Sequence, residues 1–188
     1  MKKLFCLMLA CLLLFSLSAC EREEQYDAKP VIYLYPEQET DVRVTLELAG
    51  ELTCAYPAYG DGWSVRAAPD GTLTDGSGQT YRYLYWEGTS AVDYDFSTGF
   101  CVAGENTAAF LEDALARLGL TRGEANEFII YWLPQMQDNA YNPAPDTLLR
   151  VFMAWQPSER FIELPAQELS APERTGFTAV EWGGCAVR

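Results

Sequence analysis

Hydrophobic and polar residues alternate most regularly between residues 42 and 48. The apolar positions are Val42, Val44, Leu46 and Leu48, and the positions between them are Arg43, Thr45 and Glu47. A period of two predicts a strand with one face on the core and the other in solvent. The preceding run VIYLY, residues 31–35, is rich in β-prone residues and predicts a strand that Pro36 ends. After Gly50, the segment 51–56 is placed to return as the partner of strand 42–48.

Asp–Gly turns divide the next part of the chain. They occur in YGDGW (59–63), APDGT (68–72) and TDGSGQ (74–79). This pairing supplies the positive φ of tight hairpins, so the short segments between the turns, WSVRAA and TLT, predict an antiparallel meander. The following segment TYRYLYWEG, residues 80–88, carries aromatic residues at both odd and even positions. It predicts a strand that is covered on both faces.

The hydrophobic period changes to that of a helix after Glu105. Residues 108, 111, 115 and 118 are apolar, and Gly119 is placed to end this helix. Thr121 and Glu124 match a capping box, which predicts a second short helix. The run EFIIYWLP, residues 127–134, predicts a buried strand that Pro134 ends.

Two further strands are predicted in the C-terminal part, in TLLRVFMAW (147–155) and GFTAVEW (176–182). Strands are therefore followed by one or two helices and then by strands again. This order predicts a single α+β domain with a mostly antiparallel sheet.

The first twenty residues have the three-part layout of a secretory signal. Lys2 and Lys3 precede an apolar run that ends in Leu-Ser-Ala-Cys at residues 17–20. This ending resembles the bacterial lipobox. The resemblance implies that the chain is cut before Cys20 and that its thiol receives a diacylglyceryl group. The alternative is an ordinary cleaved signal whose last residue is a cysteine.

The expected organisation is a signal peptide over residues 1–19, a lipidated cysteine with a charged tether over 20–28, and one domain over 29–188. The tether sequence EREEQYDA has no apolar periodicity. Several fatty chains on one residue hold a protein on a bilayer, whereas one chain holds it weakly. The expected location is the extracytoplasmic face of a bacterial membrane or envelope.

The charge of the chain limits its partners. It has 27 acidic and 13 basic residues, a formal net charge of −14, and no histidine. Nucleic acid is excluded as a partner because phosphates require a cationic patch. The absence of histidine removes Ser-His-Asp and Cys-His nucleophilic sites and histidine-bound zinc. No cofactor is predicted, and the oligomeric state is left open.

Several blocks in the expected mature domain resemble a family of bacterial secreted and surface proteins that is known only as uncharacterised. The blocks are KPVIYLYP, PDGTLTD with YLYWEG, GFCV, FIIYWLPQM with NAYN, RVFMAW, and GFTAVEWGG. They run from about Lys29 to Gly184. The resemblance implies a shared fold and brings no activity, substrate or site residue.

Two glutamates lie beside tryptophan and glycine, Glu87 in YWEG and Glu181 in VEWGG. Glycoside hydrolysis uses a pair of carboxyl groups, one as the acid and one as the nucleophile or base. A neighbouring indole can raise one carboxyl pKa by desolvation. These residues are therefore the candidate catalytic pair of a hydrolase, and salt bridges or caps at strand ends are the alternative.

The aromatic and polar residues after position 131 suggest a recognition surface. Aromatic rings give a large contact area at a low entropic cost. The candidate ligand-binding residues are Trp132, Gln135, Asp138, Asn139, Tyr141 and Asn142. Core packing is the alternative for the tryptophans.

The Asp-rich turns do not complete an EF-hand loop, so no metal site is predicted. Cys54, Cys101 and Cys185 are odd in number and allow at most one disulfide, and buried free thiols are favoured.

The leading hypothesis is a lipid-anchored extracytoplasmic module that binds a glycan, a peptide or an envelope partner. The alternatives are a carboxylate-dependent glycoside hydrolase and a structural or assembly lipoprotein.

Overall fold

The computed structural model describes residues 25–90, 94–144 and 151–187. The predicted signal peptide, the lipobox with Cys20, and the first part of the tether lie outside these residues. Within the described ranges, none of the helices combines the length and the apolar character that a membrane crossing requires.

The largest sheet has five strands in the order β10-β11-β1-β7-β3. Their bounds are β1 Gln25–Tyr35, β3 Leu52–Tyr56, β7 Leu84–Ser90, β10 Val151–Trp155 and β11 Thr178–Ala186. β1 is the central strand and pairs antiparallel with both β11 and β7. Only β10 and β11 are parallel among the strands that the structure describes.

A second sheet has four antiparallel strands in the order β2-β4-β5-β6. Their bounds are β2 Thr40–Val44, β4 Trp63–Ala67, β5 Leu73–Asp75 and β6 Thr80–Tyr81. A short ribbon pairs β8, Phe100–Ala103, with β9, Tyr141–Ala144. The predicted α+β class with a mostly antiparallel arrangement is therefore confirmed.

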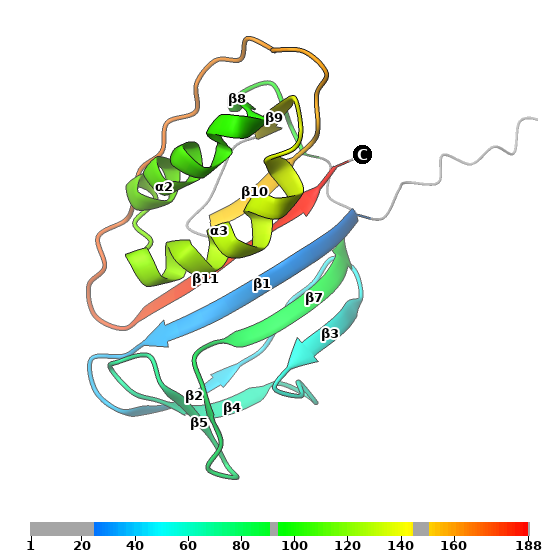
Figure 1. The fold of residues 1–188 in the computed structure, drawn as a ribbon. Coiled ribbons are helices and arrows are strands. Elements are labelled where there is room, and N and C mark those ends of the chain that lie inside the picture. Colours follow the sequence, from blue (N-terminus) through cyan, green and yellow to red (C-terminus); the bar gives the residue numbers. More distant parts are fainter. Residues whose placement is uncertain (1–24, 91–93, 145–150, 188) are drawn as a thin grey trace, which may run out of the picture.

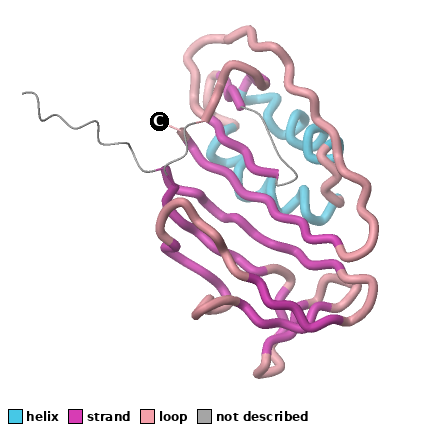
Figure 2. Tube along the Cα trace, turned by 180° about the vertical axis from the view of Figure 1, so that it is seen from behind, coloured by secondary structure: helices cyan, strands magenta, loops and turns pink. Residues whose placement is uncertain are grey.

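The domain has three layers. The helices are η1 Gly104–Asn106, α2 Thr107–Arg117 and α3 Arg122–Met136. Figure 1 shows α2 and α3 on one side of the five-stranded sheet and the small sheet on the other, and Figure 2 shows the same layers from behind. The five-stranded sheet is therefore covered on both faces, as the aromatic pattern of β7 predicts.

Alternate residues of β1 supply the two halves of the core. Val31 and Tyr33 pack among the helices, whereas Ile32 and Leu34 pack against the small sheet. This alternation follows from the pleat of the strand, in which successive side chains point to opposite faces. Trp182 belongs to the helix side and Trp63 to the small-sheet side, so both core halves are built around large aromatic residues.

The prediction of a strand over residues 127–134 is wrong, because this run is part of α3. The predicted capping box is confirmed: the Thr121 side chain accepts from the Glu124 N–H, and the Glu124 carboxylate accepts from the Thr121 N–H. Pro134 lies inside the helix near its end. A helix that is apolar around most of its circumference lacks a clear period of 3.6 residues, so its sequence pattern resembles that of a buried strand.

Two strand pairings also differ from the sequence predictions. The strand at residues 40–44 pairs with β4, and β3 pairs with β7 in the other sheet. The segment 80–88 contributes to two strands, β6 and β7, which belong to different sheets. The chain between β2 and β3 thus passes from one sheet to the other and does not form a hairpin.

A long connection without helix joins β10 to β11. Residues 156–177 run along the outer side of α2 before they return to the sheet (Figure 1). The Gly99 N–H donates to the Pro165 carbonyl at 3.0 Å, and the Ile162 N–H donates to Cys101 Sγ at 3.3 Å. Loops of this length without secondary structure are uncommon in compact domains, and this one is held by specific contacts.

Cys54, Cys101 and Cys185, the cysteines among the described residues, take part in no disulfide. Cys185 is buried, as predicted for an inert thiol, whereas Cys54 is exposed on the edge strand β3. The alternative of one disulfide is therefore not realised among these three residues.

Candidate functional site

The two glutamates of the predicted catalytic pair lie on opposite faces of the five-stranded sheet. Ile32 of β1 is the register partner of both Glu181 and Leu84, so these three residues share one face. Trp86 lies two residues after Leu84 on this same face, and its Nε1 donates to Glu181 Oε1 at 3.0 Å. Glu87 is the next residue and points to the other face. The arrangement does not bring the two carboxylates across one cleft.

The structure does not place the predicted ligand-binding residues after position 131 in one loop. Some of them lie in the core, and others lie at the C-terminal end of α3. Trp132 is 1% exposed and packs in the core on the helix side of the sheet. Gln135 Nε2 donates to the Tyr131 carbonyl at 3.1 Å, and Asn139 Nδ2 donates to the Gln135 carbonyl at 3.2 Å. The bond from Asn139 satisfies the Gln135 carbonyl, which is one of the last four carbonyls of α3. Asp138 is exposed in the turn that follows.

The remaining two residues of that prediction, Tyr141 and Asn142, begin strand β9. The structure describes their backbone pairing with Ala103 and Val102. Their side chains lie outside the described part. The six predicted ligand-binding residues are therefore divided between the buried face of α3, its C-terminal end and the β8–β9 ribbon.

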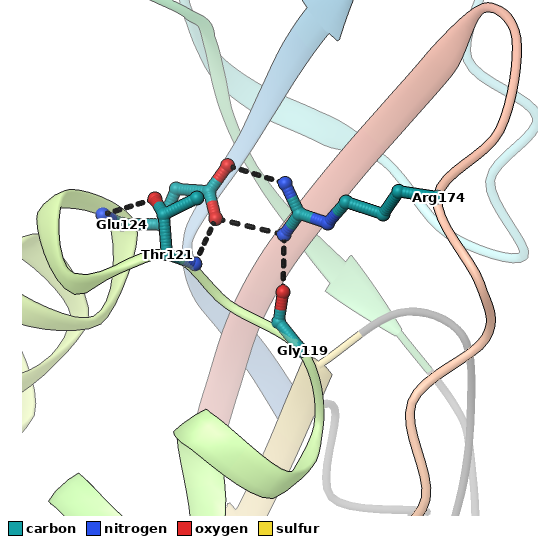
Figure 3. Close-up of polar contacts among 4 residues, drawn as sticks. All are labelled: Gly119, Thr121, Glu124 and Arg174. Atoms are coloured by element: carbon teal, nitrogen blue, oxygen red, sulfur yellow. Dashed lines mark hydrogen bonds and ion pairs between the residues drawn. The ribbon is translucent and has the colours of Figure 1, made fainter.

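A buried carboxylate fastens the long loop to the helices (Figure 3). Glu124 is fully buried, and Arg174 of the loop donates to both of its oxygens, with Nη2 to Oε2 at 2.9 Å and Nη1 to Oε1 at 3.3 Å. Arg174 Nη2 also donates to the Gly119 carbonyl at 2.6 Å. The Thr121 N–H donates to Glu124 Oε2 at 2.6 Å. We call these four residues the Arg174 clasp.

The environment keeps the Glu124 carboxylate ionised. Burial raises its pKa, but hydrogen bonds from Arg174, the Thr121 N–H and the Tyr35 hydroxyl outweigh burial and hold the pKa below its usual value. Burial and the hydrogen bond to Glu124 in turn raise the pKa of Tyr35. The clasp and its neighbour Tyr35 therefore carry one ionised acid, one protonated phenol and one guanidinium at neutral pH.

A second Tyr–Glu–Arg group lies next to the clasp. The Tyr33 hydroxyl donates to Glu127 Oε2 at 2.6 Å, and Arg82 Nε forms an ion pair with Glu127 Oε1 at 2.9 Å. The ring centroids of Tyr33 and Tyr35 are 6.2 Å apart and their planes are nearly parallel. Burial, followed by the hydrogen bond to Glu127, raises the pKa of Tyr33. Both groups join α3 to β1 and favour a structural role, because their acids are engaged by an arginine and a tyrosine and are not placed to exchange protons with a ligand.

The outer face of the small sheet is hollowed into a groove with a volume of about 570 Å³. The exposed residues of β4, Ser64 and Arg66, alternate with the buried residues of the strand. In register, Asp41 of β2 and Thr74 of β5 flank Arg66, and Arg43 of β2 opposes Ser64. The polar residues whose side chains project from the strands into the groove are Asp41, Arg43, Ser64, Arg66 and Thr74. Its size lies within the range of small-ligand sites.

Both arginines of the groove are held by carboxylates. Arg66 Nε lies 2.9 Å from Asp41 Oδ1 and 3.8 Å from Glu39 Oε1. Arg43 Nη2 lies 3.3 Å from Asp61 Oδ2 and donates to the Asp61 carbonyl at 2.9 Å. These are solvent-exposed pairs, so each adds little to folding stability. They nevertheless restrict the positions of the two guanidiniums in the groove.

The hairpin between β5 and β6 forms one rim of the groove. Asp75 Oδ1 accepts from the Ser77 N–H, the Ser77 hydroxyl and the Gln79 N–H, and Asp75 Oδ2 accepts from the Tyr81 hydroxyl. The side-chain hydrogen bonds from Ser77 and Tyr81 lower the pKa of Asp75 to about 2. Gly78 has a φ of 87°, which favours glycine at this turn. The Asp75 carboxylate is thus used to fix the rim.

The sequence pattern predicts that most of the groove residues lie on strands, but it does not predict that these strands are neighbours. Their alternation with apolar residues is visible in WSVRAA and DVRV, whereas the pairing of β2 with β4 is not. In the described ranges, no three acidic or cysteine residues are grouped closely enough to hold a metal ion.

Comparison with known proteins gives a relative without a stated activity. No family model and no solved structure matches the chain. An uncharacterised protein from the bglA 3′ region of Butyrivibrio fibrisolvens is 46% identical over 65 residues, which make up 33% of this chain and 67% of that protein. The chain belongs to the same family as this Butyrivibrio protein.

Proposed function

We propose that this protein is a lipid-anchored extracytoplasmic binding module whose ligand lies in the groove on the outer face of the small sheet. The observation that carries the proposal is the groove itself, a hollow of about 570 Å³ lined by polar side chains of three adjacent strands. The inner face of the same sheet packs on the five-stranded sheet through Trp63, Val65 and Leu73. The outer face is therefore open to a ligand.

The groove is built on rigid elements. Ser64 and Arg66 alternate with Trp63, Val65 and Ala67, each of which is at most 5% exposed. A strand that is anchored on one face fixes the backbone positions from which the side chains of its other face project. Sites on such strands are more precise than sites on loops.

The proposed anchor is Cys20. Lys2, Lys3, the apolar run and the lipobox-like ending support it. Residues 21–24 separate this cysteine from the start of β1 at Gln25. The five residue steps from Cys20 to Gln25 span at most about 18 Å when fully extended, so the domain would stay close to the membrane that holds the lipid.

A glycan, muropeptide and peptide array tests the binding proposal. The probe is the mature chain with Cys20→Ser, which keeps it free of lipid. The blocking variant is Gly76→Tyr, because Gly76 lines the groove and a Cβ there meets no atom within 4 Å. The matched control is Ile130→Tyr, which places the same side chain on an α3 position that is 74% exposed.

The expected result is that the wild type and Ile130→Tyr bind the same ligands and that Gly76→Tyr loses them. Equal binding by all three proteins would place the ligand outside the groove. Release of reducing ends during incubation would identify a hydrolase in place of a binding module.

A further inference from the structure

The charges of the groove indicate which class of ligand it takes. We infer that the groove selects an uncharged, hydroxyl-rich chain, a segment of a neutral glycan, over anionic glycans; this ligand class rests on the proposed function. Two features of the groove support it: the charge balance, and the donors and acceptors that remain available to a ligand.

The two guanidiniums are already compensated. Arg66 faces Asp41 and Glu39, and Arg43 faces Asp61. Three carboxylates therefore accompany two arginines. An anionic ligand would meet no excess positive charge and would be repelled by these acids. A neutral ligand is not repelled.

The Arg66–Asp41 pair leaves groups that can bind hydroxyls. Among the described residues, both ion pairs of Arg66 are made through Nε, so its terminal amino groups remain able to donate. Asp41 uses Oδ1 for this pair and can accept with Oδ2. Two neighbouring sugar hydroxyls can therefore bind the pair together, one accepting from the guanidinium and the other donating to the carboxylate. Ser64 and Thr74 add hydroxyl groups that both donate and accept.

Val42 and Val65 line the groove, but their side chains pack on the inner face of the sheet, so they present backbone to the groove. The rim is open at Gly76 and Gly78, where a Cβ would meet no atom within 4 Å. A chain longer than the groove can thus continue past this rim.

Calorimetric titration of the mature protein with three probes of similar length tests the ligand class. The probes are an uncharged glucan hexasaccharide, a galacturonate hexasaccharide and a glycerol-phosphate oligomer. We expect the glucan alone to bind the wild type, with a Kd that changes less than about twofold between low and high salt because no net charge is neutralised. Gly76→Tyr should abolish this binding.

A charge variant supplies a gain of function. Glu39→Gln with Asp61→Asn removes two acids while the Arg66–Asp41 pair remains, and both acids are well exposed, so folding should be unaffected. Removing two nearby negative charges should make galacturonate binding detectable, a gain of at least about tenfold over the detection limit that the wild type does not reach. The paired control is Glu112→Gln with Asp113→Asn on α2, which removes the same charges elsewhere and should change nothing.

The outcomes separate the two proposals. Tighter binding of galacturonate or glycerol phosphate than of glucan by the wild type would overturn the ligand class while leaving the groove as the site. Binding of a peptide alone, if Gly76→Tyr blocks it, would do the same. If none of the ligands in the screen is lost in Gly76→Tyr, the proposed function fails together with the ligand class.

Discussion

Replacing Arg174 with alanine removes the cation that compensates a fully buried carboxylate. Arg174 is 29% exposed and donates to both oxygens of Glu124, as well as to the Gly119 carbonyl (Figure 3). After the substitution, Glu124 keeps the Thr121 N–H and the Tyr35 hydroxyl as partners. The carboxylate would then be buried without a charge partner, which is the costly case for an ion pair.

We expect Arg174→Ala to lower the free energy of unfolding by about 3 kcal/mol at pH 7, the lower end for loss of one partner of a buried pair. For a domain of this size, that loss lowers the Tm by roughly 6–12 °C. The matched control is Arg122→Ala, since Arg122 pairs with Glu112 at the surface, where the side chains are 67% and 50% exposed. The control should lose less than about 1 kcal/mol.

The pH dependence of the effect follows from the pKa of Glu124. In the wild type this pKa is below its usual value, so the contribution of Glu124 is present above about pH 4.3, the ordinary value of a glutamate, and is lost as the pH falls through the folded-state pKa. Without Arg174, burial dominates and the pKa rises above the usual value. The variant should therefore recover part of its lost stability on acidification, because protonation removes the buried charge.

Urea unfolding of the wild type, Arg174→Ala and Arg122→Ala at pH 7 and pH 5, followed by tryptophan fluorescence, measures both effects. The stability difference between the wild type and Arg174→Ala should be smaller at pH 5 than at pH 7. A loss no larger than that of Arg122→Ala, or a difference that does not change with pH, would refute the account of the clasp.

Three further predictions concern the fold. Gly119→Ala should cost about 2 kcal/mol in urea unfolding, because Gly119 has a φ of 84° and a Cβ there lies 2.7 Å from the Ala171 Cβ; a loss below about 0.5 kcal/mol would contradict this. Under native conditions a thiol reagent should modify exposed Cys54 rapidly and buried Cys185 only after unfolding; rapid modification of Cys185 would show that the C-terminal end of β11 opens. Tyr33→Phe should lower stability by about 1 kcal/mol in the same unfolding assay through loss of the bond to Glu127, and unchanged stability would show that the bond contributes nothing net.

The elements that could be predicted are those whose hydrophobic pattern has a single period. The alternation around Val42 and Val44 marks β2, and the recurrence of Leu111 and Leu115 marks α2. The same reasoning fails for the run 127–134, because α3 is apolar on several sides and contains β-branched and aromatic residues that also favour strands. The capping box at Thr121 is the better guide to this helix.

The groove could be predicted only in part. The outward positions of Ser64 and Arg66 follow from the pattern of β4, but their juxtaposition with Asp41 depends on the pairing of β2 with β4. The two strands are not neighbours in the sequence, because β3 lies between them and pairs with β7 in the other sheet. Local turn chemistry does not contain this information. The Arg174 clasp cannot be predicted from the sequence for a similar reason. Arg174 is 50 positions from Glu124, so the local pattern does not indicate that they are in contact.

Backbone amide NMR shifts during titration with the uncharged glucan hexasaccharide test the central claim most directly. Binding in the groove predicts that the amides that shift most belong to Arg43, Ser64, Arg66, Thr74 and Gly76, while those of residues 135–139 at the end of α3 stay unchanged. Shifts centred on residues 135–139, or no shifts with any ligand that the array identifies, would contradict it.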